Sequence, residues 1–403
     1  MEYFSVKNEI GFILGIVGVQ FATVLRNIFP AINLVQFTMI LSILLVTNFR
    51  NLKKFQFPSF SIILGLFIYL QLYMLFVNCC SLINVKYVLY QSYVICFILA
   101  ISTQSKFKHF RYFDKILFFV VMLISIVVVY QGTGGFTSFN MYSEYFYKGD
   151  IEENGLEQGG DKITLGRALG LGVILALCGD LSMMPILKIF QIFLSLVGLI
   201  LFSTRAVLLM CPIYFIIKFF YYDKRNILYF MTSFKLFVLT LLCIFSIFYF
   251  LGDFFYPIIE SIYKAIGTML WGNTSLGGDI SAEGRFNTIA KTIECFYSAN
   301  LFELIWGQGH YFYVDVPILQ AFHDFGLIGG GLYFYLMILL PFQLVFKLHD
   351  IGENQIQILQ LFVLQYMADQ FYCGEPYYFF HFMPIVLLCF VVSNQKMGEY
   401  ANE

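Results

Sequence analysis

Charged residues are scarce in this chain: Asp, Glu, Lys and Arg make up 12% of its 403 residues, against about 25% in average soluble proteins. Apolar residues reach 60% and aromatic residues 20%. The 24 Lys and Arg residues nearly balance the 25 Asp and Glu residues, so no net positive charge attracts nucleic acid. This composition excludes a soluble enzyme, a nucleic-acid binder and a disordered scaffold, and it indicates a membrane protein with several spans.

Motifs for several common chemistries are also missing. The sequence contains no Gly-Lys dipeptide and hence no Walker A loop, which excludes an ATP-driven pump in this chain. It also lacks H-E-x-x-H, G-x-S-x-G and the D-x-D pair that metal-dependent sugar-nucleotide transferases commonly use. The nine cysteines form no C-x-x-C pair, and most lie in apolar runs, where cysteine acts as a small hydrophobic residue. We therefore expect no metal site and no cofactor; a disulfide from Cys79 or Cys80 to Cys373 is the minor alternative.

Apolar stretches predict an all-α integral membrane protein with about twelve transmembrane helices. The first stretch has no small-residue cleavage site after it, so we expect a retained span and not a cleaved signal. The long stretch 318–346 is either one tilted helix or a short helix that enters the membrane, followed by a span. The predicted spans lie near 10–28, 30–47, 60–78, 82–101, 115–132, 164–180, 184–202, 206–222, 232–251, 318–346, 356–373 and 376–394.

Basic residues set the expected orientation. Threading twelve spans places fifteen Lys and Arg residues on one side and nine on the other, so the positive-inside rule makes both termini cytoplasmic. The large external loop contains helix-like pieces at 257–270 and 284–297, with Ser281 as a plausible N-cap. The predicted parts are N-terminal transmembrane helices 1–131, an acidic external loop 132–163, central transmembrane helices 164–251, a large external catalytic and glycan-binding loop 252–317, and C-terminal transmembrane helices 318–403.

Arginine is unusually frequent on the predicted outer side. Four of the seven arginines are external in this topology, but only five of the seventeen lysines. Arg167, Arg205 and Arg285 are each expected at a helix beginning on the outer boundary, where backbone N–H groups also favour an anion. Guanidinium binds phosphate through two parallel hydrogen bonds and keeps its charge when partly desolvated. Together they favour an anionic-ligand site, although each alone is better explained by a snorkelling side chain paired with a carboxylate.

The external loop also supplies candidate proton-transfer and aromatic groups. Ionisable residues within membrane segments are functional candidates by default, and a His–Asp helix contact is the structural alternative for His323 with Asp324. The aromatic residues either stack on sugar rings or form part of an interfacial belt. The candidate acids and bases are Glu283, Glu303, His310, Asp315 and His323, and the candidate glycan-binding aromatics are Trp306, Tyr311 and Tyr313.

Four short motifs occur in a definite order over roughly 160–335. They are Ser203-Thr-Arg205-Ala, Gly284-Arg285, Ile305-Trp-Gly-Gln-Gly-His-Tyr-Phe, and Asp315 followed by Leu319-Gln and Gly326-Leu-Ile-Gly. In these motifs the chain resembles the bacterial O-antigen polymerase and ligase families, which are membrane glycosyltransferases of the C type. Ligases of this clan typically carry His-Asn where this chain has Asp315 and Val316. The aspartate favours the polymerase branch.

The resemblance implies transfer of a growing glycan from undecaprenyl pyrophosphate onto a new lipid-linked repeat unit, at the outer face of the bacterial cytoplasmic membrane. It assigns Arg167, Arg205 and Arg285 to the pyrophosphate, with Arg205 also catalytic. Asp315 is the first choice for the base and His310 the second. The implied partners are lipid-linked repeat units, membrane lipid and a candidate chain-length regulator protein, with no nucleic acid. The alternatives are an O-antigen ligase and a multi-pass flippase or transporter of lipid-linked or anionic solutes.

Overall fold

The computed structural model is helical almost throughout the residues it describes. These are 3–28, 34–49, 61–80, 85–104, 109–132, 155–179, 185–201, 204–222, 231, 235, 238, 242, 280–308, 314, 316–347, 354–371 and 376–400. Among them there is no β-strand, only an isolated bridge between Tyr3 and His109. The all-α class is therefore confirmed.

The observed helices follow the predicted apolar stretches closely. The exceptions are the span predicted at 164–180, whose helix begins earlier, at Gly155, and the span predicted at 318–346, which is broken at Gly326. Of 232–251 only scattered residues are described, and the predicted loop helix 257–270 lies outside the described residues. The elements are α1 Val6–Ile28, α2 Leu34–Val46, α3 Ser61–Cys80, α4 Val85–Ser102, α5 Phe113–Gly132, α7 Gly155–Cys178, α8 Pro185–Leu201, α9 Arg205–Ile217, η2 Lys218–Tyr222, α12 Ile280–Ser298, α13 Leu301–Trp306, α14 Pro317–Phe334, η4 Tyr335–Leu339, α15 Leu340–Lys347, α16 Asn354–Asp369, η5 Phe379–His381 and α17 Phe382–Tyr400.

By length and composition alone, three segments of the described chain could cross a membrane: Val6–Leu25, Phe113–Tyr130 and Pro317–Phe346. The third is counted across a break at Gly326. Seven shorter apolar helices accompany them in the described residues. These helices favour a membrane protein. The twelve predicted crossings and their orientation stay predictions.

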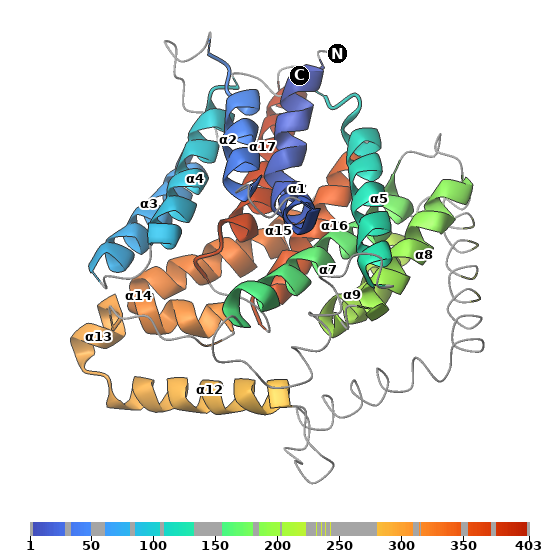
Figure 1. The fold of residues 1–403 in the computed structure, drawn as a ribbon. Helices are drawn as coiled ribbons and strands as arrows, with labels where there is room; N and C mark the ends of the chain where they lie inside the picture. Colours follow the sequence, from blue (N-terminus) through green and yellow to red (C-terminus); the bar gives the residue numbers. More distant parts are fainter. Residues whose placement is uncertain are drawn as a thin grey trace.

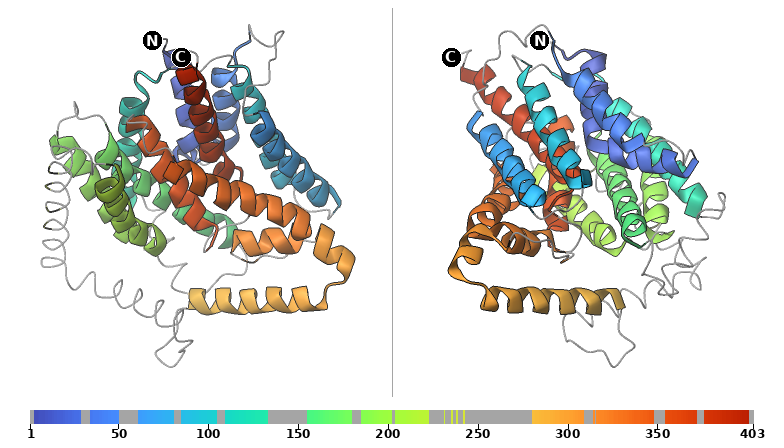
Figure 2. Two further views of the ribbon diagram at one scale, coloured as in Figure 1. Left: turned by 180° about the vertical axis from the view of Figure 1, so that it is seen from behind. Right: turned by 60° about the vertical axis from the view of Figure 1, so that its left-hand side comes forward.

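The helices form a bundle with one helix lying across its end. In Figure 1, α1 begins and α17 ends at the same end of the bundle, while α12 lies crosswise at the opposite end, and both views in Figure 2 agree. α12 is the part of the predicted 252–317 loop that this arrangement places, and the sidedness of the loop and of the termini stays a prediction. α12 begins at Ile280, so Ser281 lies inside the helix and is not the N-cap expected from sequence.

Small residues allow the helices to approach closely. A side chain at Gly11 would meet Leu45 Cβ at 2.8 Å, and the Gly11 carbonyl accepts a 2.7 Å hydrogen bond from Ser42 Oγ. α1 and α2 therefore pack backbone to backbone, as helices in membranes commonly do at small residues. Where the chain offers bulky side chains instead, rings pack together, as Phe4, Phe12 and Phe110 do at ring-centroid separations of 5.3–5.9 Å.

α14 reverses direction within the bundle. Gly326 has φ 65° and ψ −166°, a conformation that a residue with a side chain rarely adopts. Beyond it, a Cβ on Gly330 would lie 2.7 Å from Phe322 Cα, whereas residues eight apart in a straight helix are about 12 Å apart. The two halves of α14 thus fold back on each other as a tight hairpin. Of the two predicted forms of 318–346, the short helix followed by a longer one is the form observed.

Candidate functional site

A fully buried ion pair lies near the centre of the bundle. Arg167 on α7 places Nε 2.5 Å from Oδ2 of Asp369 on α16, and the two side chains are 2% and 1% exposed. Two isolated charges at this depth would each lose several kcal/mol of hydration. Because Arg167 keeps its charge under all ordinary conditions, Asp369 is the group that makes its burial tolerable.

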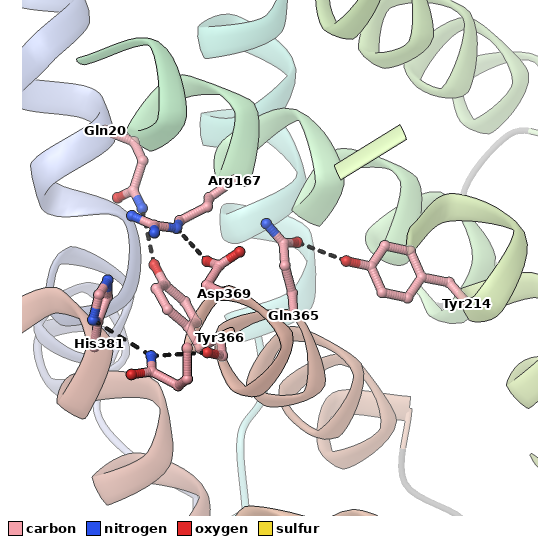
Figure 3. Close-up of polar contacts among 8 residues, drawn as sticks. Gln20, Arg167, Tyr214, Gln365, Tyr366, Asp369 and His381 are labelled. Atoms are coloured by element: carbon pink, nitrogen blue, oxygen red, sulfur yellow. Dashed lines mark hydrogen bonds and ion pairs between the residues drawn. The ribbon is translucent and has the colours of Figure 1, made fainter. Parts of the chain in front are cut away.

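Aromatic rings and an amide complete the surroundings of the guanidinium. Its central carbon lies 4.9 Å from the ring centroid of Phe380 and 5.3 Å from that of Tyr366, within the range of cation–π attraction. Gln20 on α1 donates a 3.2 Å hydrogen bond to the Tyr366 hydroxyl. Figure 3 shows the guanidinium between the Asp369 carboxylate and this Gln20–Tyr366 pair. The Arg167 side chain is therefore held by α16 and η5, and α1 contacts the Tyr366 hydroxyl beside it.

Gln370 connects this cluster to neighbouring elements. Its Nε2 donates to the Tyr366 carbonyl at 3.0 Å and lies 3.5 Å from His381 Nδ1, while its Oε1 accepts a hydrogen bond from the Tyr333 hydroxyl of α14. Gln20 Oε1 and His381 Nε2 are buried and make no hydrogen bond within the described part of the chain. Buried polar atoms usually have a hydrogen-bond partner. These two atoms can therefore each form one more hydrogen bond, for example with a water molecule.

Glycines on either side of Arg167 let neighbouring segments pack closely against α7. A Cβ on Gly166 would meet Thr204 Cγ2 at 2.7 Å, and one on Gly170 would meet Gln365 Oε1 at 2.6 Å. Gly166 and Gly170 are four residues apart, the small-xxx-small spacing that permits close helix contact in membranes. The first contact packs the start of α9 against α7 at the residue before Arg167.

A second buried polar cluster lies at the α14 hairpin. His323 Nδ1 is 2.8 Å from Asp324 Oδ1, and Asp324 Oδ2 accepts hydrogen bonds from Tyr377 at 2.8 Å and Gln320 at 3.3 Å. The His–Asp contact is the structural alternative expected for His323. Tyr377 precedes η5, so this cluster and the Arg167 cluster draw on the same segments.

Arg167, Arg205 and Arg285 are each expected from sequence at the beginning of a helix, and for two of them this expectation is wrong. Arg167 lies in the middle of α7, which begins at Gly155, because the polar residues 155–163 expected in a loop continue the helix. Arg285 lies five residues after the first residue of α12. Only Arg205 is the first residue of its helix. The helix-terminus argument for anion binding therefore applies to Arg205 alone.

Of the remaining predicted residues, Trp306 and Glu303 lie on α13, and the others are not described. Trp306 is the last residue of α13 and is 45% exposed. Glu303, in the first turn of the same helix, forms a reciprocal capping box with Asn300. The side chains of Arg205, Arg285 and Glu283 lie outside the described part, as do all of His310, Tyr311, Tyr313 and Asp315.

Sequence reasoning missed Asp369 and His381. Both are ionisable residues within predicted spans, 356–373 and 376–394, and the rule that such residues are functional candidates could have found them. Their pairing could not be found in this way, because Asp369 meets a residue 202 positions earlier in the chain.

Comparison of the chain with family models, with curated proteins and with solved structures found no match.

Proposed function

We propose that the protein is a polysaccharide polymerase of the bacterial cytoplasmic membrane, with about twelve spans and its active site at the outer face. It transfers a growing glycan from undecaprenyl pyrophosphate onto a newly arrived lipid-linked repeat unit. The proposal rests on the order of the sequence motifs and on one observation of the structure, the juxtaposition of two arginine-bearing helices.

That observation is the contact of Gly166 on α7 with Thr204, the residue before α9, which packs the start of α9 against α7 one residue before Arg167. Arg167 is held by Asp369 and two rings, so it anchors α7 to α16. Arg205 opens α9, where the helix macrodipole and a guanidinium favour the same anion. A pyrophosphate leaving group needs such cationic stabilisation when no nucleotide is hydrolysed.

The proposed step needs an acceptor, a leaving group and a base. The acceptor hydroxyl attacks the anomeric carbon of the donor glycan, the bond from that carbon to the pyrophosphate oxygen breaks, and undecaprenyl pyrophosphate departs. The hydroxyl proton passes to a base, for which Asp315 and then His310 are the candidates from sequence. Arg205 stabilises the charge on the departing pyrophosphate, with Arg285 as a further candidate on α12.

Analysis of lipid-linked glycans in a strain lacking the gene tests the proposal. Accumulation of single repeat units is expected for a polymerase, and complete chains retained on undecaprenyl pyrophosphate would identify a ligase instead. Purified protein in liposomes should lengthen lipid-linked repeats without nucleotide sugars and in the presence of a chelator. Loss of product in chelator, restored by one particular metal, would contradict the metal-independent reaction.

A flippase or transporter is the second candidate, favoured by a row of polar residues along the buried helix α16. Lys218 donates a 2.9 Å hydrogen bond to Gln357, and Tyr214 donates a 2.8 Å bond to Gln365. Asp369 then follows one turn after Gln365. Polar and ionisable residues along a buried helix are typical of a transport pathway. Translocation of lipid-linked repeats by the wild-type protein in liposomes without any lengthening of them, with translocation lost in a variant lacking these amides, would favour this function.

A further inference from the structure

The turn between α12 and α13 carries exposed apolar side chains at the edge of the bundle. Tyr297 is 88% exposed, Leu301 74%, Phe302 70% and Trp306 45%. We call these four residues the aromatic corner. Figure 1 places α13 at the periphery, beside the end of α14. An exposed cluster of this kind marks a contact with another apolar phase.

Two contacts fix the depth of the aromatic corner relative to α3. The Tyr73 hydroxyl donates hydrogen bonds to the Trp306 carbonyl at 2.7 Å and to the Phe325 carbonyl at 3.2 Å. Tyr73 lies seven residues before the end of α3, which is about 10 Å along the helix axis. The backbone of Trp306 therefore lies beside the helix and not beyond its end.

The surface next to the aromatic corner is apolar as well. On α3, Leu72 and Phe76 flank Tyr73 and are 53% and 68% exposed, and Leu327 follows the α14 reversal at 63% exposed. In a protein that crosses a membrane, such side chains face lipid. The aromatic corner continues this lipid-facing surface at the level where tyrosine and tryptophan are enriched in membrane proteins.

α12 has three faces: one buried against the bundle, one polar and exposed, and one apolar and exposed. With 100° per residue, the exposed polar residues Asn287, Lys291 and Glu294 share one side, and buried Thr292 lies on the inner side against the bundle. Ile293 and Tyr297 lie on the edge between them, in line with the aromatic corner. This three-sided pattern is that of a helix lying in the plane of a membrane interface, with one edge in lipid.

We infer that the aromatic corner inserts into the headgroup and upper acyl region of the bilayer that the apolar helices cross, and so anchors the α12–α13 segment. The anchor is linked to the α14 hairpin. Gly307 and Gly326 both have positive φ and interlock, with a Cβ on Gly307 lying 2.2 Å from the Asp324 carbonyl oxygen. The inference assigns Trp306 to lipid and not to sugar, and it does not depend on the proposed polymerase reaction.

Tryptophan fluorescence can test the anchor directly, because the chain has two tryptophans. The Trp271→Phe variant keeps Trp306 as the sole reporter in full-length protein in lipid nanodiscs. We expect lipids brominated near the top of their acyl chains to remove most of its emission, while aqueous iodide has little effect. A matched control combines Trp271→Phe, Trp306→Phe and Glu294→Trp, which puts the reporter on the polar side of α12.

The control reporter should respond in the opposite way, with strong quenching by iodide and little by brominated lipid. Elution of each variant as a single symmetric peak in size-exclusion chromatography establishes that it is folded. Iodide quenching of Trp306 without quenching by lipid would overturn the anchor and return Trp306 to the aqueous, glycan-facing alternative. Protection of Trp306 from both quenchers would also overturn it, because protein would then cover the aromatic corner.

Discussion

Replacement of Asp369 by asparagine removes the charge that compensates Arg167 while keeping nearly the same side-chain shape. At an effective dielectric constant of 20, two charges about 4 Å apart attract each other by about 4 kcal/mol. Breaking a buried pair by neutralising one partner typically costs about 3–5 kcal/mol, since the other charge stays buried and uncompensated. We therefore expect Asp369→Asn to lower the free energy of unfolding by about 3–5 kcal/mol.

Unfolding in detergent, followed for the wild type and the variant, measures this loss. Glu294→Gln is the matched control, because it makes the same chemical change on the exposed side of α12, where surface substitutions change stability by about 0.5 kcal/mol or less. The double variant Arg167→Met, Asp369→Leu replaces the pair by apolar residues and should recover most of the lost stability. A loss below about 0.5 kcal/mol for Asp369→Asn would refute the reasoning.

The same double variant separates stability from function. If the pair anchors the α7–α9 contact beside Arg205, the folded double variant should make markedly shorter glycan chains. Arg167→Lys tests the geometry, because a lysine cannot reproduce the planar stacking on Phe380 and Tyr366 together with the Nε contact. Normal chain lengths in the folded double variant would show that the pair serves packing alone.

Three further substitutions test other parts of the structure. Gly326→Ala should sharply lower the yield of folded protein, since Gly326 has φ 65° and its Cβ would lie 2.4 Å from backbone atoms. Gly331→Ala is the control and should be neutral, because a Cβ there meets nothing within 4 Å. Equal effects of the two substitutions would contradict the hairpin. Glu9→Gln should cost about 1–3 kcal/mol of unfolding free energy, because Glu9 is buried and accepts 2.7 and 2.8 Å hydrogen bonds from two backbone amides before α5. Arg205→Lys should shorten glycan chains through a rate loss of roughly 10²–10³, while Arg111→Lys on the exposed surface should not; wild-type chain lengths in Arg205→Lys would favour a snorkelling role.

The helices of the bundle could be predicted largely from apolar runs, and the reason is physical. A helix surrounded by lipid and other apolar helices must be apolar over most of its length, so α3, α4 and α5 are found within a few residues of their predicted bounds. The start of α7 was misplaced because Gly155–Asp161 is polar and glycine-rich. Hydropathy marks the apolar part of a helix and not its polar extension.

The candidate site could be predicted only in part. The unusual distribution of arginine pointed to Arg167 and Arg205, but Asp369 could be paired with Arg167 only through tertiary structure. The reversal of α14 was one of two predicted alternatives, since glycines mark a possible break without specifying its angle. The positive φ of Gly326 is set by the opposing turn at Gly307, which lies nineteen residues earlier and belongs to another element.

Gln370 relates the ion pair to this reversal. Its carbonyl accepts a 3.4 Å hydrogen bond from the Ile318 amide in the first half of α14, and its side chain accepts one from Tyr333 in the second half. The same side chain donates to the carbonyl of Tyr366, the ring beside Arg167. One residue next to Asp369 thus holds both arms of the hairpin against the charged cluster. Because residues in one hydrogen-bond network do not contribute additively to stability, we expect substitutions in the hairpin and in the Arg167 cluster to have non-additive effects on the free energy of unfolding.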